Sequence, residues 1–437
     1  MKVQKFGGTS VGSPKRIKDV ASLITTSPGK NIIVLSAMSG TTNSLLEITG
    51  ALKEGDLNKA REVLKNLSHK YEGVIEELYS TKEAKSKARN FVNGVFQEIE
   101  NWFERKYSIR TEKEIVSKGE IISTHLMQFY LEEIGKKSVL ISALDFMFTD
   151  NNGEPAYTSI RNSLNEILSG LQDYDLILTQ GFICRNPEGK VDNLLRGGSD
   201  FTASIIGAMA NADEVDIWTD IDGMHNNDPR FVEETSPVHN LHFEEAAELA
   251  YFGAKILHPT CILPAKLNNI PVRLLNTMAP EAEGTLINNE LEQGSIKAVA
   301  AKDNITAIKI KSSRMLLAYG FLKKVFEVFE KYRTPIDMIA TSEVGVSLTI
   351  DDNRHLEEIL HDLKELGTVT VDKDMVIICV VGDLEWQNKG FEARALDALR
   401  NVPVRMISYG GSNYNISFLI DKDNKTKALR LLSYHLF

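Results

Sequence analysis

The chain has 437 residues, 43% of them hydrophobic and 25% charged, and a formal net charge of −10. That length predicts two or three domains with sizeable cores, as in an ordinary soluble protein. The acidic balance argues against nucleic acid or a membrane surface as the main partner. No apolar run reaches membrane-spanning length, and the chain begins directly with a strand pattern, so no signal peptide is expected. Three widely spaced cysteines fit a reducing cytoplasm and indicate no structural zinc site.

The first glycine turn follows a short strand pattern at the N-terminus. Residues 2–6 alternate between polar and apolar side chains, Gly7-Gly8 ends the strand, and Ser13-Pro14 suits the start of a helix over 15–25. Backbone N–H groups and the helix dipole make such a turn attractive to anions, and Lys5 adds a positive charge. We interpret it as a phosphate cradle, although it is not a Walker A loop. A turn that needs glycine only for space is the alternative, and spacing alone favours that alternative slightly.

Continuous apolar runs later in the chain predict buried parallel strands. They cover 31–36, 137–144, 174–179 and 212–218, and each ends in a polar or glycine-rich loop. Helical patterns between them predict an α/β domain whose ligands bind beyond the carboxyl ends of the strands. The charged helical stretch 45–107 is interpreted as an excursion on one side of the sheet, a solvated helix pair rather than a lid.

After residue 294 the elements shorten and the chain repeats itself. Gly320-Phe321 and Gly390-Phe391 each open a helix, and each unit ends a strand at an aspartate, Asp351 or Asp421. The interval from glycine to aspartate is 31 positions in both units (320 to 351 and 390 to 421). This order predicts a βαββαβ unit present twice. Chance similarity of two α+β stretches is the alternative, which the equal spacing disfavours.

A second glycine turn, Gly197-Gly198-Ser199-Asp200, precedes a helix rich in small residues. Asp200 alone would be an N-terminal cap that interacts with the helix dipole. Arg196 directly before the turn favours a binding role, because its guanidinium fork suits a carboxylate. Glu120 lies near the start of a helix over 114–133, where a carboxylate is favourable for the dipole; its functional alternative is a counter-charge for a substrate ammonium.

The polar loop 219–230 follows a strand and contains several acidic residues. Their spacing does not fit an EF-hand, and a nucleotide-binding loop fits better; Asp228-Pro229 alone is an everyday turn. A helix over 243–258 follows, in which Lys255 alone would be a surface lysine. HExxH, Ser-His-Asp and Cys-His patterns are missing, so hydrolase and metalloenzyme functions have little support.

Taken together, these motifs resemble those of the aspartokinases, in that family's order, across the whole first 260 residues. They are Lys5-Phe-Gly-Gly-Thr-Ser-Val-Gly12, Gly119-Glu120, Gly181-Phe182, Arg196-Gly-Gly-Ser-Asp200, Thr219-Asp220, Asp228-Pro229-Arg230 and Phe252-Gly-Ala-Lys-Ile-Leu-His-Pro259. The double repeat resembles the paired ACT domains of the same enzymes, and nothing in the chain resembles the homoserine dehydrogenase fused to some relatives. Each motif alone is modest evidence, whereas the ordered set is specific.

The resemblance implies a three-layer amino acid kinase fold with a mainly parallel sheet over 1–292. Ferredoxin-like ACT domains would follow over 303–375 and 376–437, the second completed in relatives by a strand over 296–301. The implied reaction transfers the γ-phosphoryl group of ATP to the side-chain carboxylate of L-aspartate, giving 4-phospho-L-aspartate, the first step of lysine, threonine and methionine biosynthesis. Mg²⁺ would come mainly with the nucleotide. A carboxylate with an ordinary pKa of about 3.9 is already ionised at neutral pH and needs no general base, so the protein's task is positioning and charge neutralisation.

The resemblance also implies a role for each candidate residue. Lys5 would stabilise the transferring phosphoryl group, and Asp200 would orient Lys5 and the substrate. Arg196 would bind the α-carboxylate of aspartate and Glu120 its α-ammonium. The remaining candidates are, for the aspartate pocket, Thr42, Phe182 and Ser199, and, for ATP, Gly7, Gly8, Ser10, Thr219, Asp220, His225, Arg230 and Lys255.

The first repeat resembles the effector pocket of lysine-inhibited aspartokinases, and Asp337 is expected to bind an effector ammonium. The other pocket residues are Met315, Phe321, Leu322, Ser342, Glu343 and Val344. Packing of an ACT dimer is the alternative role for these side chains. Ala318 and Tyr319 replace polar or smaller residues of relatives, which leaves lysine or threonine open as the effector. Edge-to-edge pairing of ACT domains implies a homodimer, with a tetramer as the alternative.

Two positions depart from the family pattern. His225 stands where relatives often have tyrosine near adenine, and Leu195 where a glycine commonly precedes the arginine. Two alternatives to a feedback-regulated aspartokinase stay open: another kinase of this fold, for glutamate or uridylate, and a non-catalytic amino-acid sensor. Glu120, the Arg196 turn and the tandem repeats together argue against the first, and the intact charged residues argue against the second.

Overall fold

The computed structural model describes residues 1–194, 197–253, 259–312 and 319–437. They form two compact units, Met1–Gly223 with Leu257–Asn289 (unit 1) and Met224–Ile256 with Glu290–Phe437 (unit 2). Each unit has its own sheet and its own core. None of the helices within the described ranges combines the length and the apolar composition that crossing a membrane requires.

Unit 1 contains a mainly parallel sheet, as the sequence predicts. Its strands lie in the order β3 (Val139–Leu140), β4 (Leu176–Gln180), β2 (Asn31–Leu35), β1 (Lys2–Phe6), β7 (Glu214–Thr219), β9 (Val272–Asn276) and β10 (Thr285–Asn288). All neighbours from β3 to β9 are parallel, and β10 is antiparallel to β9. A separate antiparallel pair consists of β5 (Ile183–Arg185) and β6 (Val191–Asn193).

The central strands of unit 1 are buried on both faces. Every residue of β2 and of β4 is buried, which is why these strands appear in the sequence as continuous apolar runs rather than as an alternation. β1 is paired in parallel with β2 on one side and with β7 on the other, so that Phe6 lies between Leu35 and Trp218. The carboxyl ends of these neighbouring strands therefore meet at one edge of the sheet.

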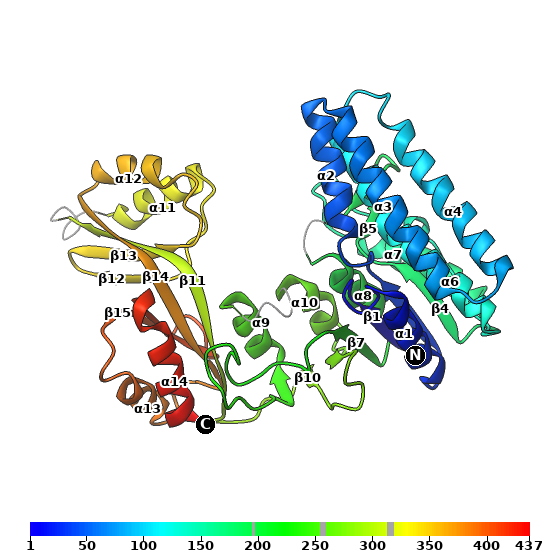
Figure 1. Ribbon diagram of the computed structural model, residues 1–437. Helices are drawn as coiled ribbons and strands as arrows, with labels where there is room; N and C mark the ends of the chain where they lie inside the picture. The colour runs from blue at the N-terminus through cyan, green and yellow to red at the C-terminus, as the bar shows by residue number, and fades with distance from the viewer. Residues whose placement is uncertain (195–196, 254–258, 313–318) are drawn as a thin grey trace. The chain divides into compact units, whose positions relative to one another are not determined.

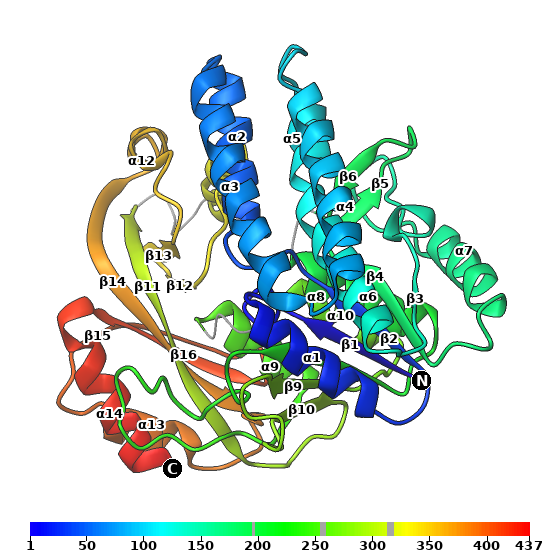
Figure 2. The same cartoon turned by 45° about the vertical axis from the view of Figure 1, so that its right-hand side comes forward.

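Helices cover both faces of this sheet. One face carries α1 (Pro14–Thr26) and α6 (Lys118–Glu133), and α1 lies in front of β1 in Figure 2. The other carries α8 (Gly198–Met209), against which α7 (Tyr157–Ser169) and α10 (Pro259–Leu267) pack. The three-layer architecture expected from the sequence is thus present. The 3₁₀ turn Ala143–Asp145 follows β3.

Long helices project from unit 1 (Figure 1). In the chain they follow β2 and precede β3. They are α2 (Thr41–Glu54), α3 (Leu57–Leu78) and α4 (Lys82–Asn101), followed by the short α5 (Ile109–Val116). The charged pattern over 45–107 predicts a helical excursion correctly, but the expected solvated helix pair is wrong, because this stretch contains three long helices whose apolar faces are buried. Its apolar residues, among them Leu64, Tyr71 and Phe96, join the same core as β2 and α6.

Two sequence expectations for unit 1 differ from the structure. The strand expected over 137–144 is only two residues long, because the 3₁₀ turn at Ala143–Asp145 takes over part of its apolar run. The helix expected over 114–133 is divided between α5, which ends at Val116, and α6, which begins at Lys118. Ser117 separates them, so Glu120 lies in the first turn of α6.

Unit 2 is built on an antiparallel sheet. Its strands lie in the order β12 (Ile339–Ser342), β13 (Gly345–Ile350), β11 (Ile296–Lys311), β14 (Thr368–Gly382), β16 (Asn415–Asp421) and β15 (Val404–Tyr409). The two long central strands, β11 and β14, pair with each other along their whole length and serve both halves of the sheet. Register shifts on β11 and residues with positive φ, Asn304 and Asp374, mark the point between the halves.

Each half of unit 2 has its own helices and core. In the first half α11 (Phe321–Lys331) and α12 (Leu356–Lys364) cover one core, and in the second α13 (Phe391–Ala398) and α14 (Lys425–Leu436) cover another. α11 and α13 both begin directly after an N-cap glycine, Gly320 or Gly390, as the repeated Gly-Phe pairs predict. The domain boundaries at 292, 303–375 and 376–437 stay predictions.

Unit 2 also contains the segment Met224–Ile256. This segment carries β8 (Asn240–His242) and α9 (Phe243–Tyr251). The helix expected over 243–258 is shorter than predicted, because it ends at Tyr251. The chain then turns at Gly253, where φ is +123° and a Cβ would lie 2.2 Å from the Ala301 carbonyl oxygen. Residues 254–258 lie outside the described residues.

Candidate active site

The candidate residues of unit 1 gather at the carboxyl ends of its parallel strands. Gly7-Gly8 follows β1, residues 36–40 follow β2, Gly181-Phe182 follows β4, and Thr219-Asp220 closes β7. Because these strands are neighbours in one parallel sheet, the four loops lie along a single edge. That edge is where open α/β sheets bind their ligands.

Lys5 and Asp200 form a largely buried ion pair at this edge. Lys5 lies near the end of β1, and its Nζ is 2.7 Å from Oδ1 of Asp200 in the first turn of α8. The ammonium also lies over the glycine turn, since it is 3.2 Å from the position that a Cβ would take on Gly7. The Lys5 side chain is 10% exposed, so water screens its charge only weakly. The pair thus fixes the Lys5 ammonium beside the backbone of the glycine turn.

The glycine turn is closely packed against the loop after β2. A Cβ on Gly8 would lie 2.8 Å from the Ala37 carbonyl oxygen, a distance that no larger residue tolerates without movement. The Ser39 N–H donates to the Gly8 carbonyl oxygen at 3.0 Å. The sequence alone favoured a turn with glycine for space, and Gly8 does satisfy that need; space and anion binding are compatible roles.

Glu120 is a buried carboxylate with few partners. Its side chain projects from the first turn of α6, and Oε1 accepts a hydrogen bond of 3.3 Å from the Ala37 N–H. Oε2 is buried and has no hydrogen-bond partner among the described residues, which also contribute no cation to it. Burial raises the pKa of the Glu120 carboxyl to about 7, although its own backbone N–H and the Ala37 N–H lower it in part. Such a site favours a ligand that brings its own positive charge.

The residues expected in the aspartate pocket lie around the second glycine turn and the start of α2. Ser199 is buried in the first turn of α8, where it accepts a hydrogen bond of 2.8 Å from Ser36. Phe182 has a positive φ of 68°, and its N–H donates to Thr202 Oγ1 at 2.9 Å. A Cβ on Gly181 would lie 2.4 Å from that of Ser199, so glycine is required there. Thr42 is half-buried in the first turn of α2.

The ATP candidates of unit 1 differ in their surroundings. Ser10 is fully buried, and its Oγ is 2.7 Å from Thr277 Oγ1, so this hydroxyl already has a protein partner. Thr219 Oγ1 accepts a hydrogen bond from the Ile221 N–H at 3.1 Å, and Asp220 is exposed beside it. Ser10 therefore fixes the turn from within, whereas Asp220 is open to solvent.

Two further ATP candidates, His225 and Arg230, belong to unit 2. The exposed Arg230 guanidinium forms an ion pair with Asp228, with Nη2 at 2.6 Å from Oδ2. His225 Nδ1 lies 2.8 Å from Thr235 Oγ1. Arg196, Lys255 and Met315, together with Leu195, His258 and Ala318, lie outside the described residues.

The expected effector carboxylate, Asp337, already has a cation from the chain itself. Its side chain is 1% exposed, and Oδ1 lies 2.6 Å from Nζ of Lys302 on β11. The same oxygen accepts a hydrogen bond of 2.9 Å from the Tyr251 hydroxyl on α9, while Lys302 also pairs with Asp351 at 2.9 Å. Burial raises the pKa of Asp337 above its ordinary value, against the effect of Lys302. Oδ2 is buried with no hydrogen-bond partner among the described residues.

The other effector candidates lie on the first half of unit 2. Phe321 is buried in its core, whereas Leu322 is 37% exposed on the same helix. Ser342 ends β12, and Glu343 and Val344 form the exposed turn that leads to β13.

The sequence reasoning missed several residues that complete these sites. Ser36, Ala37 and Ser39 bind site residues from the loop after β2, which the sequence marks only as small and polar. Lys302 and Tyr251 bind Asp337 from segments that are 35 and 86 positions away. No sequence motif links such distant residues, so a signal for them was not available.

Comparison with known proteins places this geometry in a class. The model of the amino acid kinase family matches residues 1–276, and that of an ACT domain matches residues 378–436. Fold and site thus define a kinase of the amino acid kinase family with an attached ACT region.

Individual relatives identify the family within this class of kinases. Aspartokinase 1, chloroplastic, of Arabidopsis thaliana is 35% identical over 96% of this chain and 77% of its own length. Two solved structures of E. coli aspartokinase III cover 100% of both chains: the complex with aspartate and ADP (R-state) has a TM-score of 0.85 at 30% identity, and the complex with lysine and aspartate (T-state) a TM-score of 0.84 at 31% identity. The chain belongs to the aspartokinase family.

Proposed function

We propose that this chain is an aspartate kinase, which transfers the γ-phosphoryl group of ATP to the side-chain carboxylate of L-aspartate and forms 4-phospho-L-aspartate. That step opens lysine, threonine and methionine biosynthesis. The observation that carries the proposal is the buried Lys5–Asp200 pair over the glycine turn, at the same sheet edge as a buried Glu120 that lacks a cation among the described residues. The family relationship supports the same conclusion.

The chemistry asks for charge stabilisation rather than for a general base. The acceptor carboxylate is ionised at neutral pH, and the transferring phosphoryl group carries its charge on peripheral oxygens. We assign Lys5 to those oxygens, with Asp200 holding the ammonium in place through the 2.7 Å ion pair. Gly7 and Gly8 remain the proposed phosphate cradle. The Gly7 N–H donates to the Trp218 carbonyl oxygen at 3.3 Å, so we assign the Gly8 N–H as the donor to phosphate.

The substrate is recognised through its ammonium and its carboxylates. We assign Glu120 to the α-ammonium, whose charge would return the raised pKa of this carboxyl toward its ordinary value. Thr42, Phe182 and Ser199 are proposed to line the pocket, and Arg196 to bind the α-carboxylate. Lys255, Arg230, His225, Thr219 and Asp220 remain the proposed ATP contacts.

We place Mg²⁺ with the phosphate oxygens of the nucleotide, where it neutralises charge during phosphoryl transfer. Within the described ranges no group of three or more His, Cys, Asp or Glu side chains is arranged to hold a metal ion by itself. The protein's own contribution is then the Lys5 charge and the positioning of both substrates.

The ACT region is proposed to bind an inhibitory amino acid, with L-lysine as the first choice. One related structure, that of E. coli aspartokinase III in the T-state, contains lysine. Asp337 is the proposed partner of the effector ammonium, which would have to compete with Lys302 or bind Oδ2, an atom without a hydrogen-bond partner among the described residues. A homodimer through the ACT region, the tetramer and the cytoplasmic location stay predictions.

The test is a coupled assay of ATP consumption with L-aspartate, with L-glutamate and without an acceptor. We expect turnover with aspartate only, and a loss of at least about 1,000-fold in Lys5→Ala, since an oriented charge at the transferring group disappears. Lys15→Ala, an exposed lysine at the start of α1, is the control and should keep full activity. Titration of the same assay with lysine and threonine identifies the effector.

Each outcome has a definite meaning. Turnover with glutamate would favour another kinase of this fold, and no acceptor-dependent turnover would leave a non-catalytic sensor. Near-normal activity of a folded Lys5→Ala variant would remove Lys5 from the assigned role. Circular dichroism and thermal unfolding confirm that the variant is folded.

A further inference from the structure

The segment 36–41, called loop 36–41 below, consists of the loop after β2 and Thr41, the first residue of α2, and it connects the parts of the candidate active site. Three of its hydrogen bonds lead to residues already placed there: Ser36 Oγ donates to Ser199 Oγ (2.8 Å), the Ala37 N–H to Glu120 Oε1 (3.3 Å) and the Ser39 N–H to the Gly8 carbonyl oxygen (3.0 Å). A shift of this loop would therefore disturb the glycine turn, the ammonium site and the second glycine turn together.

The same loop is held from its other side by two consecutive residues of α3. Lys70 Nζ donates to the Ser39 carbonyl oxygen at 2.6 Å, and the Tyr71 hydroxyl lies 2.9 Å from Thr41 Oγ1. Neither residue belongs to the sites described above. Both come from the helical excursion that the sequence presents as a solvated helix pair.

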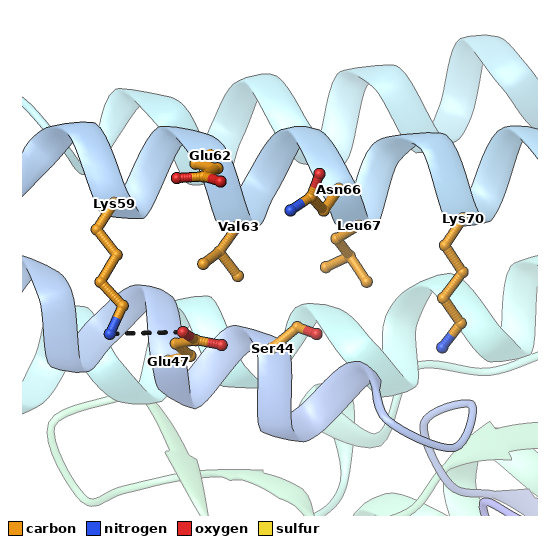
Figure 3. A pocket seen from close by; sticks show the side chains of 8 residues that line it. All are labelled: Ser44, Glu47, Lys59, Glu62, Val63, Asn66, Leu67 and Lys70. Atoms are coloured by element: carbon orange, nitrogen blue, oxygen red, sulfur yellow. Dashed lines mark ion pairs between the residues drawn. The ribbon is translucent and has the colours of Figure 1, made fainter.

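Lys70 differs from the other lysine in the same surface hollow. Figure 3 shows the hollow between α2 and α3 with Lys59 and Lys70 at its two ends. Lys59 Nζ pairs with the exposed Glu47 carboxylate at 3.5 Å, as on an ordinary helix surface. Lys70 instead reaches the loop backbone, and its partial burial lowers the pKa of its ammonium. Its ammonium therefore binds the backbone of the loop rather than a carboxylate, although this hydrogen bond is exposed.

Tyr71 is rigidly placed. It is fully buried, and its ring packs edge-to-face on Phe96 of α4 with the ring centroids 5.8 Å apart. Burial raises the pKa of the Tyr71 hydroxyl, and the nearby Glu120 carboxylate raises it further. The hydroxyl thus stays neutral and available to Thr41 at the first turn of α2.

From this geometry we infer that Lys70 and Tyr71 are positioning residues for phosphoryl transfer. By binding loop 36–41, they fix the positions of Glu120, Ser199 and the glycine turn relative to one another. The helices α3 and α4 are then part of the catalytic machinery rather than an attachment to its surface. This inference rests on the proposed aspartate kinase function.

The test compares Lys70→Met with the matched control Lys59→Met in the full-length enzyme. Both variants remove an ammonium from α3 and keep the apolar stem, but only the first releases the loop. We expect kcat/KM for aspartate to fall roughly 10- to 100-fold in Lys70→Met, because small misplacements of site groups are costly. Lys59→Met should stay within about twofold of the wild type, as surface substitutions do. Lys70→Arg, which keeps a donor, should recover part of the loss.

The pH dependence of the KM for aspartate separates positioning from mere stabilisation. The Ala37 N–H lowers the pKa of Glu120, so a loosened loop should shift the midpoint of this profile to higher pH. A purely structural role would lower the unfolding temperature and leave the profile in place. Tyr71→Phe removes a single oxygen and should produce the same upward shift to a smaller extent.

The outcomes are distinct. Wild-type enzyme without aspartate-dependent turnover would overturn the proposed function. An active wild type in which Lys70→Met and Tyr71→Phe match Lys59→Met in both kcat/KM and pH profile would overturn the positioning role. If Lys70→Met fails to fold, Tyr71→Phe decides by the same criteria.

Discussion

Two buried carboxylates, Glu120 in unit 1 and Asp337 in unit 2, differ in how the cost of burying their negative charge is reduced. Glu120 has only backbone N–H donors among the described residues, its own and that of Ala37, and burial raises its pKa to about 7. Asp337 has an ammonium at 2.6 Å and a tyrosine hydroxyl at 2.9 Å on the same oxygen. A buried charge must be neutralised or paired. Glu120 is neutralised by protonation, because its pKa is raised, and Asp337 is paired with Lys302.

This difference bears on the two roles proposed above, a substrate site at Glu120 and a regulatory site at Asp337. A ligand ammonium at Glu120 supplies a charge that the described part of the protein does not provide. At Asp337 the proposed effector ammonium would meet a carboxylate already paired with Lys302, and it would have to compete with a cation of the chain itself. We therefore expect Glu120 to determine whether the enzyme works and Asp337 to determine how it is regulated.

The largest effect is expected from Lys302→Met. It leaves Asp337 buried without its cation, and removal of one partner of a buried pair costs about 3–5 kcal/mol. Urea unfolding of unit 2 measures this loss. Lys309→Met, an exposed lysine on the same strand, should change the free energy of unfolding by less than about 0.5 kcal/mol. The double variant Lys302→Met/Asp337→Leu should recover most of the stability; an unaffected single variant would show that the pair does not form.

Glu120→Gln should reduce kcat/KM for aspartate roughly 10- to 100-fold, because a hydrogen bond to a charged group is worth about 1.5–3 kcal/mol. Asp337→Asn should leave the uninhibited kcat/KM within about twofold and should change only the response to the effector. Steady-state kinetics with varied aspartate, with and without lysine, measures both. Equal losses in the two variants would remove the contrast between the carboxylates.

The raised pKa of Glu120 makes unit 1 less stable as the pH rises. The protonated carboxyl suits its buried position, so its stabilising contribution is complete below pH 4.5 and is lost as the pH rises through about 7. The loss amounts to about 2–3 kcal/mol relative to Glu120→Gln, which does not titrate. Unfolding of both proteins from pH 5 to pH 8 measures it. Parallel stability curves would contradict the assigned pKa.

Tyr251→Phe should have the smallest effect, a destabilisation of about 1 kcal/mol, because one hydrogen bond to Asp337 is lost. The aromatic ring, which lies 4.3 Å from Lys302 Nζ, remains. The thermal unfolding midpoint measures the change. A shift as large as that of Lys302→Met would mean that the hydroxyl, and not the ammonium, holds Asp337.

The sequence predicts the framework of this molecule well, since that framework is set by local patterns. The strand over 2–6, the buried strands at 31–36, 174–179 and 212–218, and the helices after Gly320 and Gly390 are confirmed. Expectations fail where neighbours in space decide, as at the shortened strand near 137–144. Apolar runs show that a segment is buried but not where its backbone pairing ends.

The contrast between the two carboxylates could not be predicted in the same way. Sequence reasoning gave Glu120 and Asp337 the same role, the binding of a ligand ammonium. The difference comes from Lys302 and Tyr251, which the fold brings to Asp337 from a distant strand and helix. Likewise, Lys70 is one of many lysines on a charged helix until the structure shows its bond to Ser39.

The most direct test is the number of protons released when L-aspartate binds at pH 7, measured by isothermal titration calorimetry in buffers of different ionisation enthalpy. A carboxyl with a pKa near 7 is partly protonated at that pH and must lose its proton when it binds an ammonium. We predict proton release in the wild type and in Asp337→Asn, and none in Glu120→Gln. Release that is absent from the wild type, or that persists in Glu120→Gln, would contradict the assignment of Glu120 as the ammonium site.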